Sequence, residues 1–583
     1  MNPSGSRRRF MGALGALSAA GCLPGAEARR APRGAAPART PLSKPASQMQ
    51  ASYDVVVIGS GYGGAVMAAR LAPGRRLAVL ERGREWMPSD FPGTLTDALA
   101  QFRTGVTPLG LFDYRIGASM DVFSGSGLGG TSLINANVVV SADRDVFNAW
   151  PAAIRTDVAS GALDGWEARV RTMLASDAVA DADALRKQWL HRTTTQARAR
   201  QGVSTKFTPL PIAVNLRKYD QKPNAQGVTQ ALCSHCGDCV TGCRVGAKNT
   251  LDVNYLPLAR AAGADIFSRI EVDWLERLAD GRWRIHYVSR PDLAPAVSGT
   301  LVAGSVVLAA GSLGSTQVLL RSRANGLQLS PTLGTRFSAN GDLIGFGYDM
   351  AVQANTAGFG LGAPLDGEKR VGPTITGAAD YRANATISQR YLVEEGAVPR
   401  ALVDAVRLLM PVASGPFADF LANERLAKDL LSFRTDGALN HSMVYLGIGH
   451  DSASGRIQLD PFGNAQVAWP GVTQEPFVAR LRAEMGAHAQ VFAGRYVDYP
   501  RASPIFGGAL TTVHPLGGCP MSERVEDGVV NADGQVWDPR GGSTTPYANL
   551  RVVDGAIAPT SIGVNPLLTI AALAERAADR FHA

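Results

Sequence analysis

The chain has 583 residues, of which 45% are hydrophobic and 19% charged, with 64 Gly and 34 Pro. This composition excludes a disordered, collagenous or coiled-coil protein, and no apolar run approaches the roughly 18 residues of a membrane span. The formal charge of +8 comes almost wholly from residues 1–49, which carry eight Lys or Arg and one Glu, so the near-neutral remainder gives no reason to expect nucleic-acid binding.

The first 50 residues predict an export signal followed by a flexible linker. An arginine cluster, Arg7–Arg9, precedes an apolar stretch at 12–21 that is too short to span a membrane. This order resembles a twin-arginine signal, with a disordered basic tail as the alternative. The stretch ends at Cys22, a candidate for lipid attachment, and residues 29–50 are rich in Ala, Pro and Arg. We therefore expect a periplasmic or secreted protein, with Cys22 as a candidate lipid anchor.

Residues 51–81 predict a nucleotide-binding unit. An apolar run at 53–58 indicates a buried parallel strand, the loop GSGYGG follows at 59–64, and a helical pattern covers 65–71. A second strand at 77–80 ends at Glu81, where a carboxylate can accept hydrogen bonds from an adenosine ribose.

Three of the four glycines in this loop have separate expected roles. Gly59 permits the tight turn, Gly61 lets a diphosphate approach the backbone at the helix N-terminus, and Gly64 lets the helix pack on the strand. A glycine-rich turn without a ligand is the alternative. The loop alone does not distinguish FAD from NAD.

Four cysteines gather on one predicted loop, at Cys233, Cys236, Cys239 and Cys243. Their spacing resembles the ligand run of bacterial ferredoxins, although Arg244 stands where that run has proline. We expect all four to ligate an iron–sulfur centre. Structural disulfides, free thiols and zinc are the alternatives.

Further segments resemble the flavin-contacting segments of the glucose–methanol–choline (GMC) oxidoreductases. They are GSGLGGTSLINAN at 125–137, VVLAAGSLGS at 306–315, LRVVDG at 550–555 and GVNPLLTI at 563–570, with a weaker match at 270–272. HPLGGC at 514–519 is closest to the cholesterol-oxidase branch of that family.

The resemblance implies an α/β protein, with an FAD-binding Rossmann-like domain interleaved with an α+β substrate-binding domain. FAD-binding segments are expected at 51–145, 240–340 and 505–583, the last with the catalytic residues. Substrate-lobe segments are expected at 146–239, which holds the start of the cysteine cluster, and at 341–504. The implied FAD-binding residues are Gly59, Ser60, Gly61, Tyr62, Gly63, Gly64, Glu81, Gly130, Thr131, Asn135, Asn137, Val272, Gly311, Asp554, Gly555 and Leu567.

The same resemblance implies the catalytic residues. His514 matches the histidine that accepts the hydroxyl proton, and Asn565 matches the asparagine that hydrogen-bonds the substrate oxygen. Cholesterol oxidases that also isomerise their product use a Glu on a strand facing the flavin, but the corresponding stretch, 437–447, contains no acid. Its His441 is either a polar participant or a structural residue, and nothing in the sequence aims Glu394 or Glu395 at a substrate.

We therefore expect FAD-dependent oxidation of a hydrophobic alcohol, with a 3-hydroxysteroid such as cholesterol as one candidate and oxygen as acceptor. The alternative is an FAD/iron–sulfur dehydrogenase that passes electrons to a cytochrome or quinone. A flavin-binding protein without catalysis is disfavoured by His514 and Asn565. Helical apolar spacing across 401–431 indicates core packing or a lid over the pocket rather than membrane binding.

Overall fold

The computed structural model describes residues 36–180, 185–291, 294–362, 370–414, 423–432 and 435–581. The predicted export signal and Cys22 lie outside these residues. Within the described ranges, no helix has the length and apolarity needed to cross a membrane.

The nucleotide-binding unit is built around a mixed eight-stranded sheet. Its order is β20 (Gln535–Trp537), β21 (Pro546–Val552), β11 (Val297–Leu308), β1 (Ser52–Ile58), β2 (Leu77–Leu80) and β8 (Asp265–Phe267). Its centre is parallel, and β10 (Trp283–Ser289) and β9 (Ile270–Arg277) extend it through antiparallel pairing with β11. The central strands are almost continuously apolar because helices cover the sheet.

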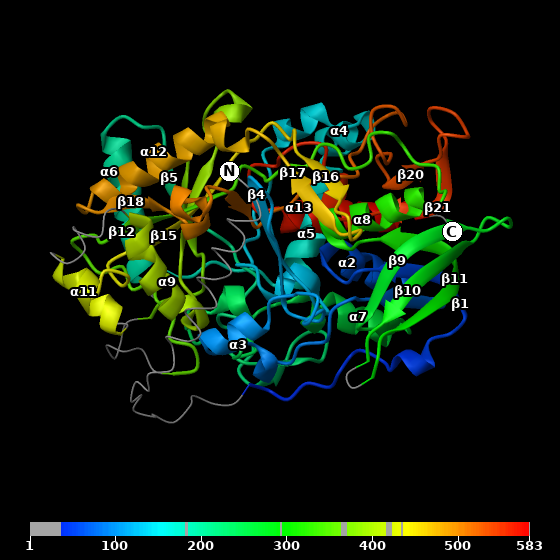
Figure 1. The fold of residues 1–583 in the computed structure, drawn as a ribbon, viewed down its shortest axis with the longest axis horizontal. Coiled ribbons are helices and arrows are strands. Elements are labelled where there is room, and N and C mark those ends of the chain that lie inside the picture. Colours follow the sequence, from blue (N-terminus) through cyan, green and yellow to red (C-terminus); the bar gives the residue numbers. More distant parts are fainter. Residues whose placement is uncertain are drawn as a thin grey trace.

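Helix α2 (Tyr62–Leu71) follows β1 directly and contacts α13 (Leu567–Asp579) and α7 (Tyr255–Ala261). In turn, α13 contacts α5 (Ala162–Leu174), and α8 (Gly311–Ala324) packs on β9. The last helix of the chain therefore lies beside the first helix of the nucleotide-binding unit (Figure 1).

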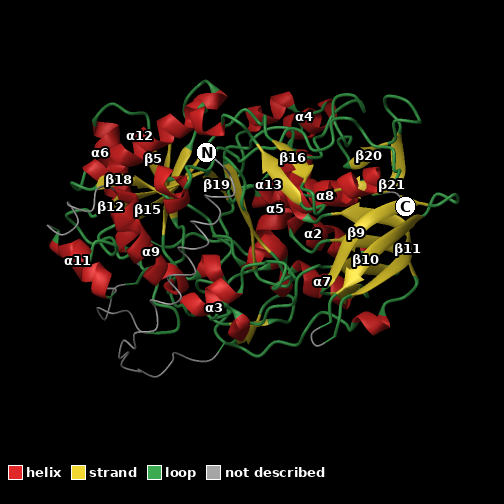
Figure 2. Cartoon of the chain, viewed as in Figure 1, coloured by secondary structure: helices red, strands yellow, loops and turns green. Residues whose placement is uncertain are grey.

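A second, antiparallel sheet forms the other end of the molecule (Figure 2). Its order is β18 (Arg495–Asp498), β12 (Leu343–Tyr348), β15 (Met443–Ile448), β14 (Leu392–Gly396), β13 (Gly377–Asp380) and β5 (Lys206–Pro209). Helices α6 (Arg186–Arg200) and α12 (Pro476–Gln490) pack on it, and α9 (Arg400–Ser414) contacts β18. Two sheets assembled from interleaved chain segments confirm the predicted fold class.

A small three-stranded sheet, β19 (Leu510–Thr512), β4 (Met120–Gly125) and β3 (Phe112–Arg115), leads directly to the segment that carries His514. The remaining elements are α3 (Leu95–Ala100), α4 (Ala152–Ala159), α11 (Glu424–Leu431), β6 (Lys222–Pro223), β7 (Thr229–Gln230), β16 (Arg456–Leu459), β17 (Ala465–Ala468) and short 3₁₀ turns.

The structure differs from the expected flexible linker over residues 36–50. Arg39 donates to Asp252 at 3.0 Å, the Leu42 amide donates to Glu85 at 2.6 Å, and the Lys44 amide donates to the carbonyl of Ile266 at 2.7 Å. Composition suggested mobility, but acids far along the chain supply partners for this segment. It is docked on the nucleotide-binding unit.

Candidate active site

One cavity of about 510 Å³ is lined by residues of both large sheets. Seventeen of the eighteen residues expected to bind FAD or act on the alcohol line it, including His514 and Asn565. Such a volume is typical of a ligand or cofactor site. Segments separated by hundreds of residues in the chain thus meet at one place.

Gly64 is the exception, because it serves packing rather than the cavity. A Cβ at this position would lie 2.1 Å from the carbonyl oxygen of Gly59, which lets α2 approach β1 as expected. Gly59 itself has φ +95°, a left-handed conformation that favours glycine. Gly61 lines the cavity at the start of α2, and a Cβ there would have no atom within 4 Å. The open side of the loop therefore faces the ligand space.

Glu81 lies at the end of β2, as predicted. Its Oε2 accepts hydrogen bonds from the amide and hydroxyl of Ser60 at 3.1 and 2.6 Å, and its Oε1 accepts from the Gly83 amide at 2.8 Å. The carboxylate lines the cavity and ties the glycine loop to the second strand.

Several buried polar atoms along the cavity lack a protein partner, as a site that receives a ligand requires. The amide nitrogen Nδ2 of Asn135 donates to the Tyr62 hydroxyl at 2.9 Å, but its Oδ1 has no partner. The Nδ2 of Asn137 and the Oδ1 of Asn565 are likewise unpaired. With the glycine loop and Glu81, these donors and acceptors fit a dinucleotide cofactor such as FAD.

His514 is held by a carboxylate that the sequence did not identify. Its Nδ1 lies 2.8 Å from Oδ1 of Asp342, so Nδ1 carries the proton and Nε2 is the nitrogen left for the cavity. Burial lowers the pKa of His514, but the negative charge of Asp342 and its hydrogen bond raise the pKa by more, and the net pKa lies above its usual value. Glu394 adds to this rise only when it is ionised. A neutral imidazole with this support is suited to accept a proton.

Glu394 is the second residue that sequence reasoning missed. It lies on β14 opposite Leu446 of β15, and its Oε2 accepts a hydrogen bond from Nδ2 of Asn565 at 3.3 Å. Its Oε1 has no protein partner, and burial raises the pKa of Glu394 to about 8. The group is therefore protonated at neutral pH.

The neighbouring Glu395 points to the other side of the strand, where it pairs with the buried Lys187. Successive residues of a strand face opposite sides, so only one of two adjacent acids can face the catalytic pair. The stretch 437–447 contains no acid, but the adjacent strand β14 carries one that contacts Asn565. The available signal was two consecutive acids within an otherwise apolar strand.

His441 does not reach the catalytic pair. Its ring contacts the carbonyl of Met350 at 2.9 Å and the guanidinium of Arg425 at 3.1 Å, outside the residues that line the cavity. Burial lowers the pKa of His441. The structural interpretation of this residue fits the geometry.

Many of the residues that line the cavity are apolar or aromatic. Helix α9 contributes Leu402, Ala405, Val406 and Leu409, and the small sheet and the second, antiparallel sheet contribute Tyr114, Phe123, Ile344, Phe346, Val444 and Leu446. This placement agrees with a helix that covers the pocket.

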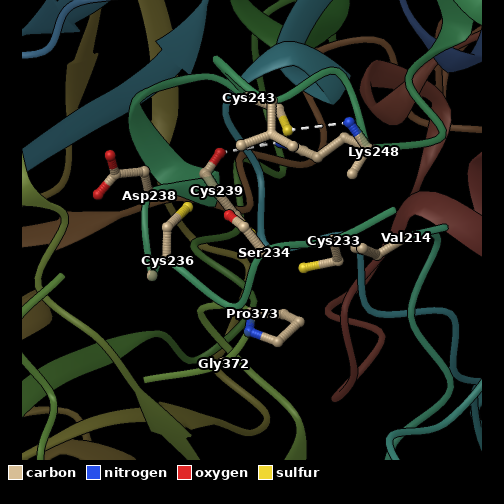
Figure 3. A pocket seen from close by; sticks show the side chains of 13 residues that line it. Val214, Cys233, Ser234, Cys236, Asp238, Cys239, Cys243, Lys248, Gly372 and Pro373 are labelled. Carbon is tan, nitrogen blue, oxygen red and sulfur yellow. Dashed lines mark hydrogen bonds between the residues drawn. The ribbon is translucent and has the colours of Figure 1, made fainter. Parts of the chain in front are cut away.

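The four clustered cysteines line a separate, small cavity of about 10 Å³, room for about one water molecule (Figure 3). All are free thiols, and burial raises the pKa of Cys233, Cys236 and Cys239. No Cys, His, Asp and Glu side chains among the described residues form a group of three or more that could hold a metal ion. As placed, the cysteines do not fit an iron–sulfur cluster, which needs four converging thiolates and far more room than one water.

The cysteine cavity nevertheless adjoins the large cavity. The turn Cys239–Thr241 separates them, with Cys239 on one side and Val240 and Thr241 on the other. Buried Lys248 donates to the carbonyls of Leu133 and Asn135 at 3.0 and 2.8 Å. It also donates to the carbonyl of Cys239 at 2.9 Å (Figure 3). Burial lowers the pKa of Lys248 to about 8. Lys248 joins the cysteine loop to the expected flavin-contacting segment, a role not predicted from the sequence.

Comparison with known families now decides the class of this site. Models of the GMC oxidoreductases match residues 53–339 and 477–574. The chain belongs to the GMC oxidoreductase family. This GMC oxidoreductase is an FAD-dependent enzyme that acts on CH–OH donors, as its cavity and glycine loop also indicate.

Characterised relatives cover nearly the whole chain. A cholesterol oxidase of Mycobacterium tuberculosis is 28% identical over 561 residues, 91% of each chain, and one of Acinetobacter baumannii is 26% identical over 554 residues, 90% of this chain and 93% of that one. A long-chain-alcohol oxidase of Arabidopsis thaliana is 24% identical and covers 89% of this chain and 65% of its own. The crystal structure of pyridoxine 4-oxidase from Mesorbium loti has a TM-score of 0.57 at 18% identity, covering 91% of this chain and 99% of that chain, and shows the same fold.

Proposed function

We propose that this GMC oxidoreductase oxidises a hydrophobic alcohol, with a 3-hydroxysteroid as the first candidate, to the ketone or aldehyde, and that oxygen is the acceptor. The observation that carries the proposal is that His514 and Asn565 line one cavity, and that apolar side chains of α9, β12 and β15 line the same cavity. The cholesterol-oxidase relatives support the sterol as the substrate to test first.

Within this proposal, the chain's own residues bind and deprotonate the alcohol. The Nε2 of His514 accepts the hydroxyl proton, because Asp342 holds the proton on Nδ1. Asn565, fixed through its Nδ2 by Glu394, orients the substrate oxygen. The apolar wall holds the hydrocarbon body and excludes water. FAD, when bound, supplies the hydride acceptor.

A substrate panel tests this function. Anaerobic flavin reduction is followed with 3-hydroxysteroids, long-chain primary alcohols and short polar alcohols at equal concentration. We expect 3-hydroxysteroids or long-chain primary alcohols to reduce the flavin much faster than the short polar alcohols. Equal or faster reduction by polar alcohols would contradict the proposal, and reduction only by long-chain alcohols would replace the sterol by that class.

We propose isomerisation of the steroid product as a second activity, because one observation favours it. Burial raises the pKa of Glu394 to about 8, the group accepts a hydrogen bond from Asn565, and one of its oxygens has no protein partner. We infer that it exchanges a proton with a steroid bound at Asn565. The test is the ultraviolet absorption of the conjugated ketone formed from a 5-ene-3-hydroxysteroid. Glu394→Gln should lower the ratio of conjugated to unconjugated ketone, and an unchanged ratio would remove this activity.

The second candidate is an FAD/iron–sulfur dehydrogenase, which the cysteine spacing suggests and which would pass electrons to a cytochrome or quinone instead of oxygen. The thiols as placed form no metal-binding group, so no electron route through them follows from the structure. Oxygen consumption is compared with reduction of a cytochrome or quinone analogue under the same conditions. If the enzyme turns over only with the cytochrome or quinone analogue, that class of acceptor replaces oxygen in the proposal.

We also propose export through the twin-arginine-like signal, with Cys22 as the candidate lipid anchor. The support is the order of Arg7–Arg9, apolar stretch and Cys22. Replacing Arg7 and Arg8 by Lys should retain the protein in the cytoplasm of its host, whereas unchanged export would contradict this signal. Loss of membrane association in Cys22→Ser, but not in Ser18→Ala, would identify the anchor.

A further inference from the structure

A single buried turn, Ser338–Asp342, contacts both segments that carry the catalytic pair. It precedes β12, and the side chains of Ser338, Asn340 and Asp342 are fully buried. Neither it nor its acid was marked by any motif in the sequence. Its contacts run to residues more than 170 positions away.

The first contact is with His514. The Oδ2 of Asp342 accepts the Thr512 hydroxyl at 2.8 Å and the amides of Val513 and His514 at 2.9 and 3.0 Å. Its Oδ1 accepts Nδ1–H of His514 at 2.8 Å. The carboxylate therefore fixes both the backbone and the ring of this histidine.

The second contact is with the loop that carries Asn565. The Oδ1 of Asn340 accepts the amides of Ile562 and Gly563 at 2.8 and 2.9 Å, and its Nδ2 donates to the carbonyl of Val564 at 2.8 Å. Three hydrogen bonds from one side-chain amide thus hold the backbone of the loop before Asn565.

Asp451 holds the turn itself through three hydrogen bonds. Asp451 accepts hydrogen bonds from the Ser338 hydroxyl at 2.8 Å and from the amides of Ala339 and Gly341, each at 2.9 Å. Asn340 and Gly341 have φ of +55° and +62°, conformations that Asn tolerates and Gly favours. A residue other than glycine keeps such a strained backbone conformation only where the surrounding contacts stabilise it.

We propose that the Ser338–Asp342 turn is the positioning element for both catalytic residues. Asp342 sets the tautomer and orientation of His514, and Asn340 sets the loop of Asn565. The proposal rests on the proposed function, in which these two residues act on the alcohol. Neither Asp342 nor Asn340 lines the cavity, so both act through another residue.

The titratable groups that face His514 within the described chain are Asp342 from the turn and Glu394 from β14. An Asn at position 342 removes the negative charge and replaces an acceptor by an amide that cannot hold Nδ1–H equally well. His514 then loses the preference for the productive tautomer, as happens when the carboxylate of a Ser–His–Asp triad is amidated.

The first test is Asp342→Asn, with the best alcohol from the substrate panel. We expect anaerobic flavin reduction to slow about 10²- to 10⁴-fold, KM to change little, and the midpoint of the rise in rate with pH to move to lower pH. The wild type should show a downfield proton resonance for Nδ1–H, identified by its loss in His514→Gln and absent in Asp342→Asn. Asp342→Glu should restore part of the rate.

The control is Asp429→Asn, which changes a buried Asp that binds the Leu439 amide away from the cavity. It should alter stability without moving the pH midpoint or the downfield resonance. An Asp342→Asn enzyme with wild-type rate, midpoint and resonance would overturn the proposal. A double variant Asp342→Asn/His514→Gln that is much slower than His514→Gln would also overturn it, because the two residues would then act independently.

Asn340→Gly tests the other arm, and it also serves if Asp342→Asn does not fold. Glycine tolerates the φ of +55° and adds no charge, but it removes all three hydrogen bonds to the loop before Asn565, so we expect a raised KM with the pH midpoint unchanged. Wild-type KM would exclude this arm. A full rate of flavin reduction in His514→Gln would instead refute the proposed function. This result distinguishes a wrong function from a wrong role for the Ser338–Asp342 turn.

Discussion

The sharpest prediction concerns Gly61 and Gly63, two glycines of the same loop that the structure assigns to different surroundings. A Cβ on Gly61 would have no atom within 4 Å, and its φ of −68° suits alanine. A Cβ on Gly63 would lie 1.6 Å from the carbonyl oxygen of Val553. Both residues line the cavity, but a side chain on Gly61 would point into open space, whereas one on Gly63 would meet the segment that follows β21.

Gly61→Ala should therefore leave the apoprotein folded, with a free energy of unfolding within about 1 kcal/mol of wild type. The new methyl group occupies the space where the diphosphate approaches the start of α2. Loss of one charge-assisted hydrogen bond there costs about 1.5–3 kcal/mol, or about a 10- to 150-fold weaker affinity for FAD. In Gly63→Ala the backbone must move, so the cost exceeds the ~1–3 kcal/mol typical of overpacking.

The assay compares the melting temperature of each apoprotein with its FAD affinity, measured by quenching of flavin fluorescence. We expect Gly61→Ala to separate the two readouts and Gly63→Ala to lower both. Wild-type FAD affinity in Gly61→Ala, or wild-type stability in Gly63→Ala, would refute the assignment of this loop.

Three further outcomes are expected. His514→Ala should retain FAD and slow flavin reduction by roughly 10²–10⁴-fold, whereas His441→Ala should not; a normal rate in the first variant would move the base elsewhere. Burial raises the pKa of Glu394 from 4.5 to about 8, so protonation stabilises the folded state at low pH, and this contribution falls by a few kcal/mol as pH rises through that window. Urea unfolding of Glu394→Gln should show a smaller loss of stability between pH 5 and pH 8 than wild type, and an equal loss would contradict the burial of this acid. Denatured protein matured in its native host should yield reactive thiols without stoichiometric iron or acid-labile sulfide, and finding both would show that the loop around Cys239 rearranges to bind a cluster.

Much of the site could be predicted from local sequence, because each of its segments is a continuous run of residues. The strand, glycine loop, helix and second strand of residues 52–81 depend on neighbouring residues whose spacing sets the backbone geometry, and the structure has them as predicted. The positions of His514 and Asn565 came from the family resemblance. The docking of residues 36–50 and the role of Lys248 did not follow, because their partners are distant acids and carbonyls.

The sequence by itself thus determined the fold class, the nucleotide-binding unit and the family. Only the tertiary structure decided that Asp342 holds His514 across 172 residues and that Glu394, not Glu395, touches Asn565. It also decided that the four cysteines, which lie within eleven residues of the sequence, do not form a metal-binding group. The physical reason is that a hydrogen bond or a ligand set depends on where side chains from different strands and loops meet. The meeting point of these side chains is fixed by sheet register and packing, and the spacing of residues within one segment does not determine either of them.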